Sequence, residues 1–254
     1  MPKLAFKFRD ARVWRYAISS IEKILDEGIF IATSEGLRLR ALDTSHVAMV
    51  DFYFPREAFD EYILEGDEVD FGVSFKEFLK VLRRALKDDQ LAIKVEESSI
   101  VVSLEAVGRG SRMFRMPQIF LSMERLGEPP IEFTVRAKML GTTFRDAIKD
   151  LEVVGESVRI QASEDEEKLI LTSIGDIENA EVELSTQNQS LLDLEVREPQ
   201  AVASYSLEYF SEMLPAAQVA DSVTIMYAEL APARVDVEYG QGGRLTFYVS
   251  PREE

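Results

Sequence analysis

Apolar and polar residues alternate in short runs along most of the chain, which is the pattern of strands that bury one face. The runs are KLAFKF (3–8), GLRLRAL (36–42), VRIQA (158–162), ARVDVEY (233–239) and RLTFYV (244–249). Turn-forming segments such as DEG, SEG, EGD, GRG and GQGG recur between the runs. So many short strands predict antiparallel sheets rather than alternating βαβ units.

Four stretches have apolar residues spaced three and four apart, which predicts helices with one buried face. They span roughly 10–26, 74–87, 141–152 and 206–214. The predicted core positions are Val13, Ala17, Ile21, Ile24 and Leu25, then Phe75, Phe78, Leu79, Leu82 and Leu86, then Phe144, Ala147, Ile148 and Leu151, and finally Leu207, Phe210, Met213 and Leu214. We expect these helices to pack on the sheets, which makes the fold α+β.

The order of the predicted elements repeats. From Phe6, and again from Phe133, the chain reads strand, helix, strand, turn, strand, and each half then holds a second helix-containing unit. This self-similarity predicts a duplicated domain. Between the halves, MPQIFLSMERLGEPPIEF (116–133) contains three prolines and a glycine and follows neither period. We interpret it as a long surface connector, a kind of segment that is often functional, and divide the chain into 1–116, 117–133 and 134–254.

The composition excludes several classes of protein. The 254 residues include no cysteine, which rules out disulfides, thiolate catalysis and cysteine-based metal sites. No apolar run approaches the roughly 18 residues of a membrane span, and the first ten residues lack the apolar region of a secretory signal. We therefore expect a cytoplasmic protein with no membrane partner, no metal and no cofactor.

The net charge of −17, from 46 acidic and 29 basic residues, argues by itself against a nucleic-acid partner. The cations are nevertheless concentrated on the exposed faces of three predicted helices. They are Arg12, Arg15 and Lys23, then Lys76, Lys80, Arg83, Arg84 and Lys87, which form a single stripe, and finally Arg145 and Lys149. Such faces are either simply solvated or suited to a phosphate backbone, without reading bases. The fourth helix carries Glu208 and Glu212 and no cation.

The only histidine, His46, follows Asp43 and Ser45 and raises the possibility of a hydrolase. A catalytic triad needs the base within hydrogen-bond reach of the nucleophile and an acid on the far nitrogen of the base. Neighbours on an extended strand point apart, and no glycine-framed turn surrounds Ser45. No spaced carboxylate motif indicates a metal site either. We therefore predict no catalytic residue and no enzyme activity.

Three motifs resemble those of the proliferating cell nuclear antigen (PCNA) sliding clamps. LDTSHVAMV (42–50) is similar to the family's L/M-D-x-S-H-V-x-L-V segment, and ERLGEPPIEF (124–133) to its connector motif, Q/R-L-G-x-P. APARVDVEYGQGGRLTFYVSPREE (231–254) resembles the family's C-terminal signature. The spacing of these motifs fits the family, and the duplicated pattern between them covers essentially the whole chain. The missing cysteine, the abundant charge and the short loops resemble an archaeal clamp more than a eukaryotic one.

The resemblance implies a ring of three subunits whose helices line a hole for duplex DNA and whose sheets form the outer wall. The ten helix cations would then face the DNA. The ring would tether proteins that carry a PIP-box peptide, such as DNA polymerase, the clamp loader, flap endonuclease and DNA ligase. It would be nucleoid-associated, or nuclear in a eukaryote. The alternative is an obligate subunit of a heterotrimeric or checkpoint-type clamp with the same fold.

The resemblance also implies an apolar pocket for partner peptides on the outer surface. Carried over to this chain, the pocket consists of Leu42, His46, Val47, Met49, Leu126, Ser206, Pro232, Tyr248, Val249, Ser250 and Pro251. Ser250 stands where an alanine is typical of the family. Asp43 and Ser45 are expected to fix the turn rather than to perform chemistry.

Two predicted edge strands are expected to join subunits, as the corresponding regions do in the family. SRMFRMP (111–117) carries Arg112, Phe114 and Arg115, and DIENAEVELS (176–185) carries Asp176, Glu178, Glu181 and Glu183. Opposite charges on the two edges would favour head-to-tail closure. The alternative is that both are ordinary solvated strands, and the sequence leaves homotrimer and heterotrimer open.

Overall fold

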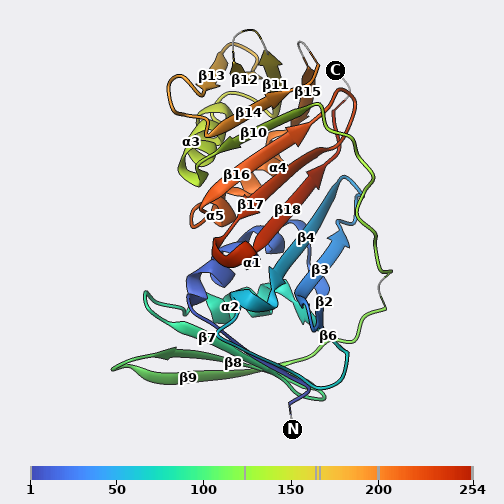
Figure 1. Cartoon of the computed structure of the whole chain (residues 1–254), viewed down its shortest axis with the longest axis vertical. Coiled ribbons are helices and arrows are strands. Elements are labelled where there is room, and N and C mark those ends of the chain that lie inside the picture. The colour runs from blue at the N-terminus through green and yellow to red at the C-terminus, as the bar shows by residue number, and fades with distance from the viewer. Residues whose placement is uncertain (1, 123, 164, 166, 199–200, 253–254) are drawn as a thin grey trace. The chain divides into compact units, whose positions relative to one another are not determined.

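A computed structural model describes residues 2–122, 124–163, 165, 167–198 and 201–252 (Figure 1). The chain forms two compact units. Unit 1 comprises Met1–Leu42, Val50–Leu126 and Gly240–Leu245, and unit 2 comprises Asp43–Met49, Gly127–Tyr239 and Thr246–Glu254. The loop 43–49 thus belongs to unit 2, although it lies in the N-terminal half of the sequence.

Unit 1 contains two groups of strands and two helices. Its five-stranded antiparallel sheet has the order β5 (Glu61–Leu64), β1 (Leu4–Phe8), β7 (Gln90–Val95), β8 (Ser99–Ala106) and β9 (Gly110–Pro117). The second group has the order β4 (Ala48–Pro55), β3 (Gly36–Leu42), β2 (Glu27–Thr33) and β6 (Glu68–Ser74). Between strands lie α1 (Ala11–Ile24), α2 (Phe75–Leu82) and two short 3-10 turns, η1 (Arg56–Ala58) and η2 (Gly240–Gly242).

The core of unit 1 is built around Trp14 of α1, which is fully buried. Six phenylalanine rings lie with their centroids 5.2 to 6.3 Å from it, namely Phe6, Phe8, Phe30, Phe52, Phe54 and Phe78. The predicted stripe of this helix was partly wrong, because Val13 and Ile24 are only half-buried while Trp14 and Ile18 are fully buried. The helix is turned so that its largest side chain, which offers the most apolar surface, faces the core.

Unit 2 repeats this plan. One group of strands has the order β14 (Asp193–Val196), β10 (Val135–Met139), β16 (Ser222–Tyr227), β17 (Ala233–Glu238) and β18 (Arg244–Val249). The other has the order β13 (Asn179–Ser185), β12 (Lys168–Ile174), β11 (Ser157–Ser163) and β15 (Val202–Ser206). The helices are α3 (Gly141–Glu152), α4 (Leu207–Glu212) and α5 (Leu214–Ala217). The four predicted core residues of α3 are all buried.

The order β1-α1-β2-β3 in the first half matches β10-α3-β11-β12 in the second, so the predicted repeat and the α+β class are confirmed. The bounds of α3, β3 and β18 are those predicted from the sequence. The predicted helices 10–26, 74–87 and 206–214 are all too long at one or both ends.

The structure explains two of these early helix ends. Beyond Leu82, the buried carboxylate of Asp89 accepts the Leu86 amide at 2.6 Å, so a side chain takes the place of the next helical turn. Leu86 is consequently 49% exposed instead of lying in the core. After α4, Pro215 has no N–H group with which to continue the helix, and a separate short helix begins at Leu214, which is half-buried.

The connector begins along β6 of unit 1. The Ile119 amide donates to the Gly72 carbonyl at 3.1 Å, and a Cβ atom at Gly72 would lie 2.2 Å from the Ile119 carbonyl oxygen. Only glycine permits this close approach. Further on, Arg125 forms ion pairs with Glu68 and Asp70 of β6. The described residues of the connector beyond Ile119 adopt neither helix nor strand.

Candidate functional site

The loop between β3 and β4 is folded around Asp43, which is 7% exposed. The Asp43 carboxylate accepts the amides of Val47 and Ala48, each at 2.8 Å, and the hydroxyl of Ser45. Short polar side chains that bind nearby amides in this way stabilise tight turns. The turn places His46 in the left-handed region, with a φ of 59°, and leaves its side chain exposed.

Tyr209 of α4 joins this loop. Its hydroxyl donates to Asp43 Oδ2 at 3.1 Å and lies 3.2 Å from Ser45 Oγ. Burial by itself would raise the pKa of Asp43, but the hydrogen bonds from Ser45, Ala48, Tyr209 and Val47 outweigh it and hold the pKa below its usual value. Sequence reasoning missed Tyr209, because a single tyrosine on an acidic helix carries no signal that it contacts a loop far away in the chain.

These contacts do not form a hydrolytic triad. A triad places a histidine between the acid and the nucleophile, whereas Ser45 donates directly to Asp43 here. The Asp43 carboxylate therefore stabilises the turn. In the described part of the chain, no group of three or more His, Asp or Glu side chains is arranged to hold a metal ion.

The C-terminal tail is attached to the same loop within unit 2. The Ser250 amide donates to the Val47 carbonyl at 2.9 Å, and the Arg252 amide donates to the Ser204 carbonyl of β15 at 2.8 Å. The Arg252 guanidinium also donates to the Glu156 carbonyl at 3.3 Å. The tail is therefore fixed by its backbone on both sides of Pro251.

The predicted pocket residues fall into three classes of exposure. His46 and Leu42 are exposed, and Met49, Tyr248 and Val249 are buried. The remaining six are half-buried: Val47, Leu126, Ser206, Pro232, Ser250 and Pro251. Leu42 and Leu126 belong to unit 1, and the others belong to unit 2.

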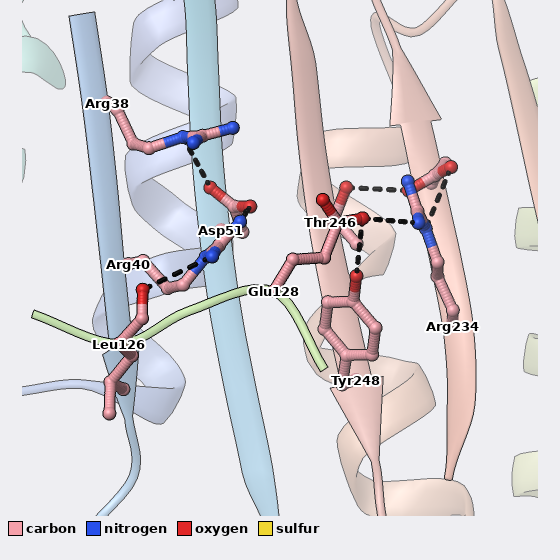
Figure 2. Close-up of polar contacts among 9 residues, drawn as sticks. Arg38, Arg40, Asp51, Leu126, Glu128, Arg234, Thr246 and Tyr248 are labelled. Atoms are coloured by element: carbon pink, nitrogen blue, oxygen red, sulfur yellow. Dashed lines mark hydrogen bonds and ion pairs between the residues drawn. The ribbon is translucent and has the colours of Figure 1, made fainter. Parts of the chain in front are cut away.

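Two arginines hold the connector, one in each unit (Figure 2). In unit 2, Arg234 of β17 donates through Nε to both oxygens of Asp236, at 3.0 and 3.2 Å, and through Nη1 to Glu128 Oε1 at 2.9 Å. The guanidinium carbon lies 5.7 Å from the centroid of the Tyr248 ring, and the Tyr248 hydroxyl lies 3.5 Å from Glu128 Oε1. Thr246 donates to Asp236 at 2.6 Å and completes the set.

In unit 1, Arg40 of β3 pairs with Asp51 of β4, and both side chains are nearly inaccessible. The same guanidinium donates through Nη1 to the carbonyl of Leu126 at 3.2 Å. Arg38 lies on the other side of the carboxylate, with Nε 3.4 Å from Asp51 Oδ1. Each arginine thus joins a buried aspartate of its own unit to one residue of the connector.

The predicted DNA-facing cations are only partly on helices. Lys76 and Lys80 lie on α2, but Arg83 caps that helix and Arg84 and Lys87 lie in the turns after it. The prediction of one five-residue helical stripe was therefore wrong. All five side chains are exposed.

On the other helices, some of the predicted cations already have partners. Arg12 pairs with Asp10, the N-cap of α1, at 2.7 Å, and the Arg15 guanidinium lies 5.2 Å from the centroid of the Tyr16 ring. Lys23 and Lys149 are exposed, whereas Arg145 is half-buried.

The predicted subunit edges are terminal strands of their sheets in the described part of the chain: β9 ends one sheet and β13 another. Arg112 of β9 pairs with Asp89 and donates to the Arg84 carbonyl, while Arg115 pairs with Glu96 and donates to Ser99. The sequence did not predict these partners, because Asp89 and Glu96 lie about twenty residues away along the chain.

The acidic edge is shorter than predicted. Asp176 and Glu178 precede β13, where the Gly175 amide and the Glu178 carbonyl close a turn at 2.9 Å. Of the predicted acidic residues, Glu181 and Glu183 are on the strand, and Glu183 pairs with Lys168 at 3.1 Å. Large apolar side chains are exposed near both edges: Met113 at 66%, Ile174 at 69% and Ile177 at 97%. Phe114 is half-buried.

Comparison with known protein families identifies the family of this chain. The family model for the N-terminal domain of proliferating cell nuclear antigen matches residues 3–110, and the model for its C-terminal domain matches residues 127–252. The chain belongs to the proliferating cell nuclear antigen family. The resemblance inferred from its three motifs is therefore confirmed, together with the two-domain PCNA fold.

Relatives cover the chain from end to end. The "DNA polymerase sliding clamp 3" of Aeropyrum pernix is 56% identical over 254 residues, which is all of both proteins. A structure of a PCNA2–PCNA3 complex from Sulfolobus tokodaii has a chain with a TM-score of 0.90 at 32% identity, covering 98% of this chain and 100% of that one. PCNA from Thermococcus kodakaraensis has the same TM-score and coverage at 28% identity. No described helix has the length and apolar character to cross a membrane.

Proposed function

We propose that this protein is a DNA polymerase sliding clamp, a ring that encircles duplex DNA and tethers replication and repair enzymes. Two findings support this proposal. Both PCNA domain models match this chain, and the chain aligns over its full length with a relative named as a sliding clamp. The divisions 1–116, 117–133 and 134–254 describe its two clamp domains and the connector between them. We place the protein in the cytoplasm, at the nucleoid.

The charge distribution suits such a ring. Phosphate contacts from Lys and Arg are independent of sequence and weaken with salt. The exposed cations of α1, α2 and α3 and of the turns after α2 would supply them along the hole: Lys23, Lys76, Lys80, Arg83, Arg84, Lys87 and Lys149. Arg12, Arg15 and Arg145 belong to the same surface. The acidic remainder of the chain would repel DNA from the outside. The ring would then stay on DNA because it encircles the duplex, and not because it binds the duplex tightly.

Partner enzymes would dock through a PIP-box peptide. Its aliphatic and aromatic side chains are suited to a hydrophobic pocket bordered by His46 and Tyr248 of unit 2. The backbone of the tail after β18 would add strand-like hydrogen bonds to the peptide. DNA polymerase, the clamp loader, flap endonuclease and DNA ligase are the expected partners. The protein itself would catalyse no reaction.

Ring closure would pair β9 of one subunit with β13 of the next. Pairing removes two exposed strand edges and covers the apolar side chains beside them. A second candidate is a subunit that closes only within a heterotrimer. The PCNA2–PCNA3 complex favours it, as does the pairing of Arg112 and Arg115 with carboxylates of their own unit. A mass of about three times 28.8 kDa for the isolated chain would support the homotrimer, and a monomer or dimer the heterotrimer.

Primer extension tests the function itself. A polymerase that dissociates after short extensions is supplied with a clamp loader, ATP and this protein on a primed circular template. We expect products that lengthen only when the loader and the protein are both present. Equal product lengths without the protein, using a loader shown to load a related clamp, would refute the proposal. Partner clamp subunits from the same cells would be added if the isolated chain is not a trimer.

A further inference from the structure

The connector is fixed at two residues that flank Gly127. On one side, Arg40 donates to the carbonyl of Leu126 at 3.2 Å, and on the other, Arg234 pairs with Glu128 at 2.9 Å. Gly127 itself is exposed, and apart from its chain neighbours no heavy atom of the described residues lies within 4 Å of the position that its Cβ would occupy. A residue without side-chain packing therefore stands between two anchored ones.

A buried aspartate holds the side chain of each anchoring arginine. The Arg40 side chain is 8% exposed against Asp51, which is 5% exposed. The Arg234 side chain is 15% exposed and binds both oxygens of Asp236, which also accepts a hydrogen bond from Thr246. A surface arginine would have to lose its own freedom of rotation in order to hold a loop. These two have already lost it, because the buried aspartates fix their guanidinium planes.

Arg234 also acts on Tyr248. Its guanidinium lies 5.7 Å from the centre of that ring, and the Tyr248 hydroxyl lies 3.5 Å from the carboxylate of Glu128. Glu128 of the connector, Arg234 of β17 and Tyr248 of β18 therefore form one cluster of contacting side chains in unit 2 (Figure 2). A displacement of Glu128 would remove this contact of the Tyr248 hydroxyl as well.

We infer that Arg40 and Arg234 are positioning residues, which hold Leu126–Glu128 in the conformation that receives a partner peptide. This inference rests on the peptide docking proposed above. A segment that is ordered before binding loses little conformational freedom when the peptide arrives, which strengthens binding without any new contact to the peptide. Neither arginine needs to touch the peptide for this effect.

Three conservative variants separate the anchoring from the integrity of the fold. Arg234→Lys keeps a cation beside Asp236, but an ammonium group cannot reproduce the fork that reaches both Asp236 and Glu128. Glu128→Gln removes the charge of the connector and leaves Arg234 paired with Asp236. Arg40→Lys keeps a cation for the buried Asp51 and shortens the reach to Leu126. The matched control is Glu61→Gln, which makes the same change in an exposed ion pair with Lys7 at 2.9 Å on another sheet.

Three measurements are made on each protein: the affinity for a fluorescent PIP-box peptide, hydrogen exchange of the connector amides, and the melting temperature. We expect Arg234→Lys and Glu128→Gln each to weaken peptide binding about fivefold. Connector exchange should accelerate while the melting temperature stays within about 3 °C of wild type. The double variant Arg234→Lys/Glu128→Gln should bind the peptide no more weakly than the single variant with the lower affinity, because both changes remove the same interaction. Arg40→Lys should accelerate exchange around Leu126, and Glu61→Gln should change neither peptide affinity nor connector exchange.

Peptide affinity and connector exchange equal to wild type in both Arg234→Lys and Glu128→Gln would overturn the inference. Additive losses in the double variant would also overturn it, because they would mean independent contacts with the peptide. If the wild-type chain does not bind the peptide, the docking proposal fails. The exchange measurement still decides whether the two arginines order the connector.

Discussion

Tyr209 of α4 donates a hydrogen bond to Asp43, 3.1 Å away, and thereby ties a helix to the loop that carries His46. The same carboxylate holds the amides of Val47 and Ala48, so a single side chain sets both the shape of the loop and its attachment. If the loop borders the peptide pocket, the conformation of a partner site depends on a residue that need not contact the partner.

Replacing Tyr209 with phenylalanine should therefore loosen the loop. The change removes one hydrogen bond to a charged, mostly buried acceptor, for which we expect a loss of about 1.5 kcal/mol in the free energy of unfolding. Urea denaturation measures this loss directly. Tyr53→Phe is the matched control, because its hydroxyl makes only a long bond of 3.4 Å to the Glu35 carbonyl. Equal stabilities of the two variants would contradict the structural role of Tyr209.

The lowered pKa of Asp43 predicts a dependence on pH. A carboxyl group with a lower pKa in the folded than in the unfolded state contributes stability above its unfolded pKa, and this contribution is lost as the pH falls through the folded value. The difference in unfolding free energy between wild type and Asp43→Asn should therefore be constant above about pH 5 and shrink below about pH 4. Denaturation across this range measures it, and a difference that grows towards low pH would have the wrong sign.

Replacing His46 with alanine should weaken the binding of a PIP-box peptide, because the exposed imidazole is lost from the border of the proposed pocket. His46 has a φ of 59°, so alanine also retains the backbone strain. His46→Gly removes the side chain without that strain and serves as the comparison. Calorimetric titration should show both variants weakened about equally, by about three- to tenfold. Binding restored by glycine would assign the effect to the backbone instead.

Neutralising Lys80, Arg83 and Arg84 together with glutamine should shorten the products of clamp-dependent synthesis. Fewer phosphate contacts should also reduce the dependence of clamp-dependent synthesis on salt. The native mass should not change, because none of the three lies on β9 or β13. Lys94→Gln on β7 is the control for a lost surface charge. Synthesis equal to wild type over a range of salt concentrations would remove these residues from the proposed DNA surface.

Much of the fold could be predicted because local patterns determine it. Alternation gave the bounds of β3 and β18, and three-four spacing gave those of α3. The errors lie where a distant or special residue intervenes. Asp89 accepts a hydrogen bond from the Leu86 amide beyond α2, and Pro215 cannot continue the hydrogen bonding of α4. In α1, burial of Trp14 orients the helix towards the aromatic core. Periodicity contains no information about such contacts.

The candidate site was predictable only in outline. The three motifs located the loop, the connector and the tail, but the side chains that hold the loop and the connector are those of Tyr209, Arg40 and Arg234. Each of these residues is far along the chain from the residue that it holds. Each is also of a type that is common at protein surfaces. The pairing of Arg112 with Asp89 was missed for the same reason.

A protein that encircles DNA stays on a circle and slides off a linear molecule, and this difference can be measured. The protein, with any partner subunits that it needs, is loaded by a clamp loader onto nicked circular DNA, purified by gel filtration at moderate salt, and passed over the column again after a restriction enzyme has opened the circle. We expect the protein to travel with the circle and to be lost from the same DNA once it is linear. Equal retention on circular and linear DNA would show that affinity holds it, and would contradict a sliding clamp.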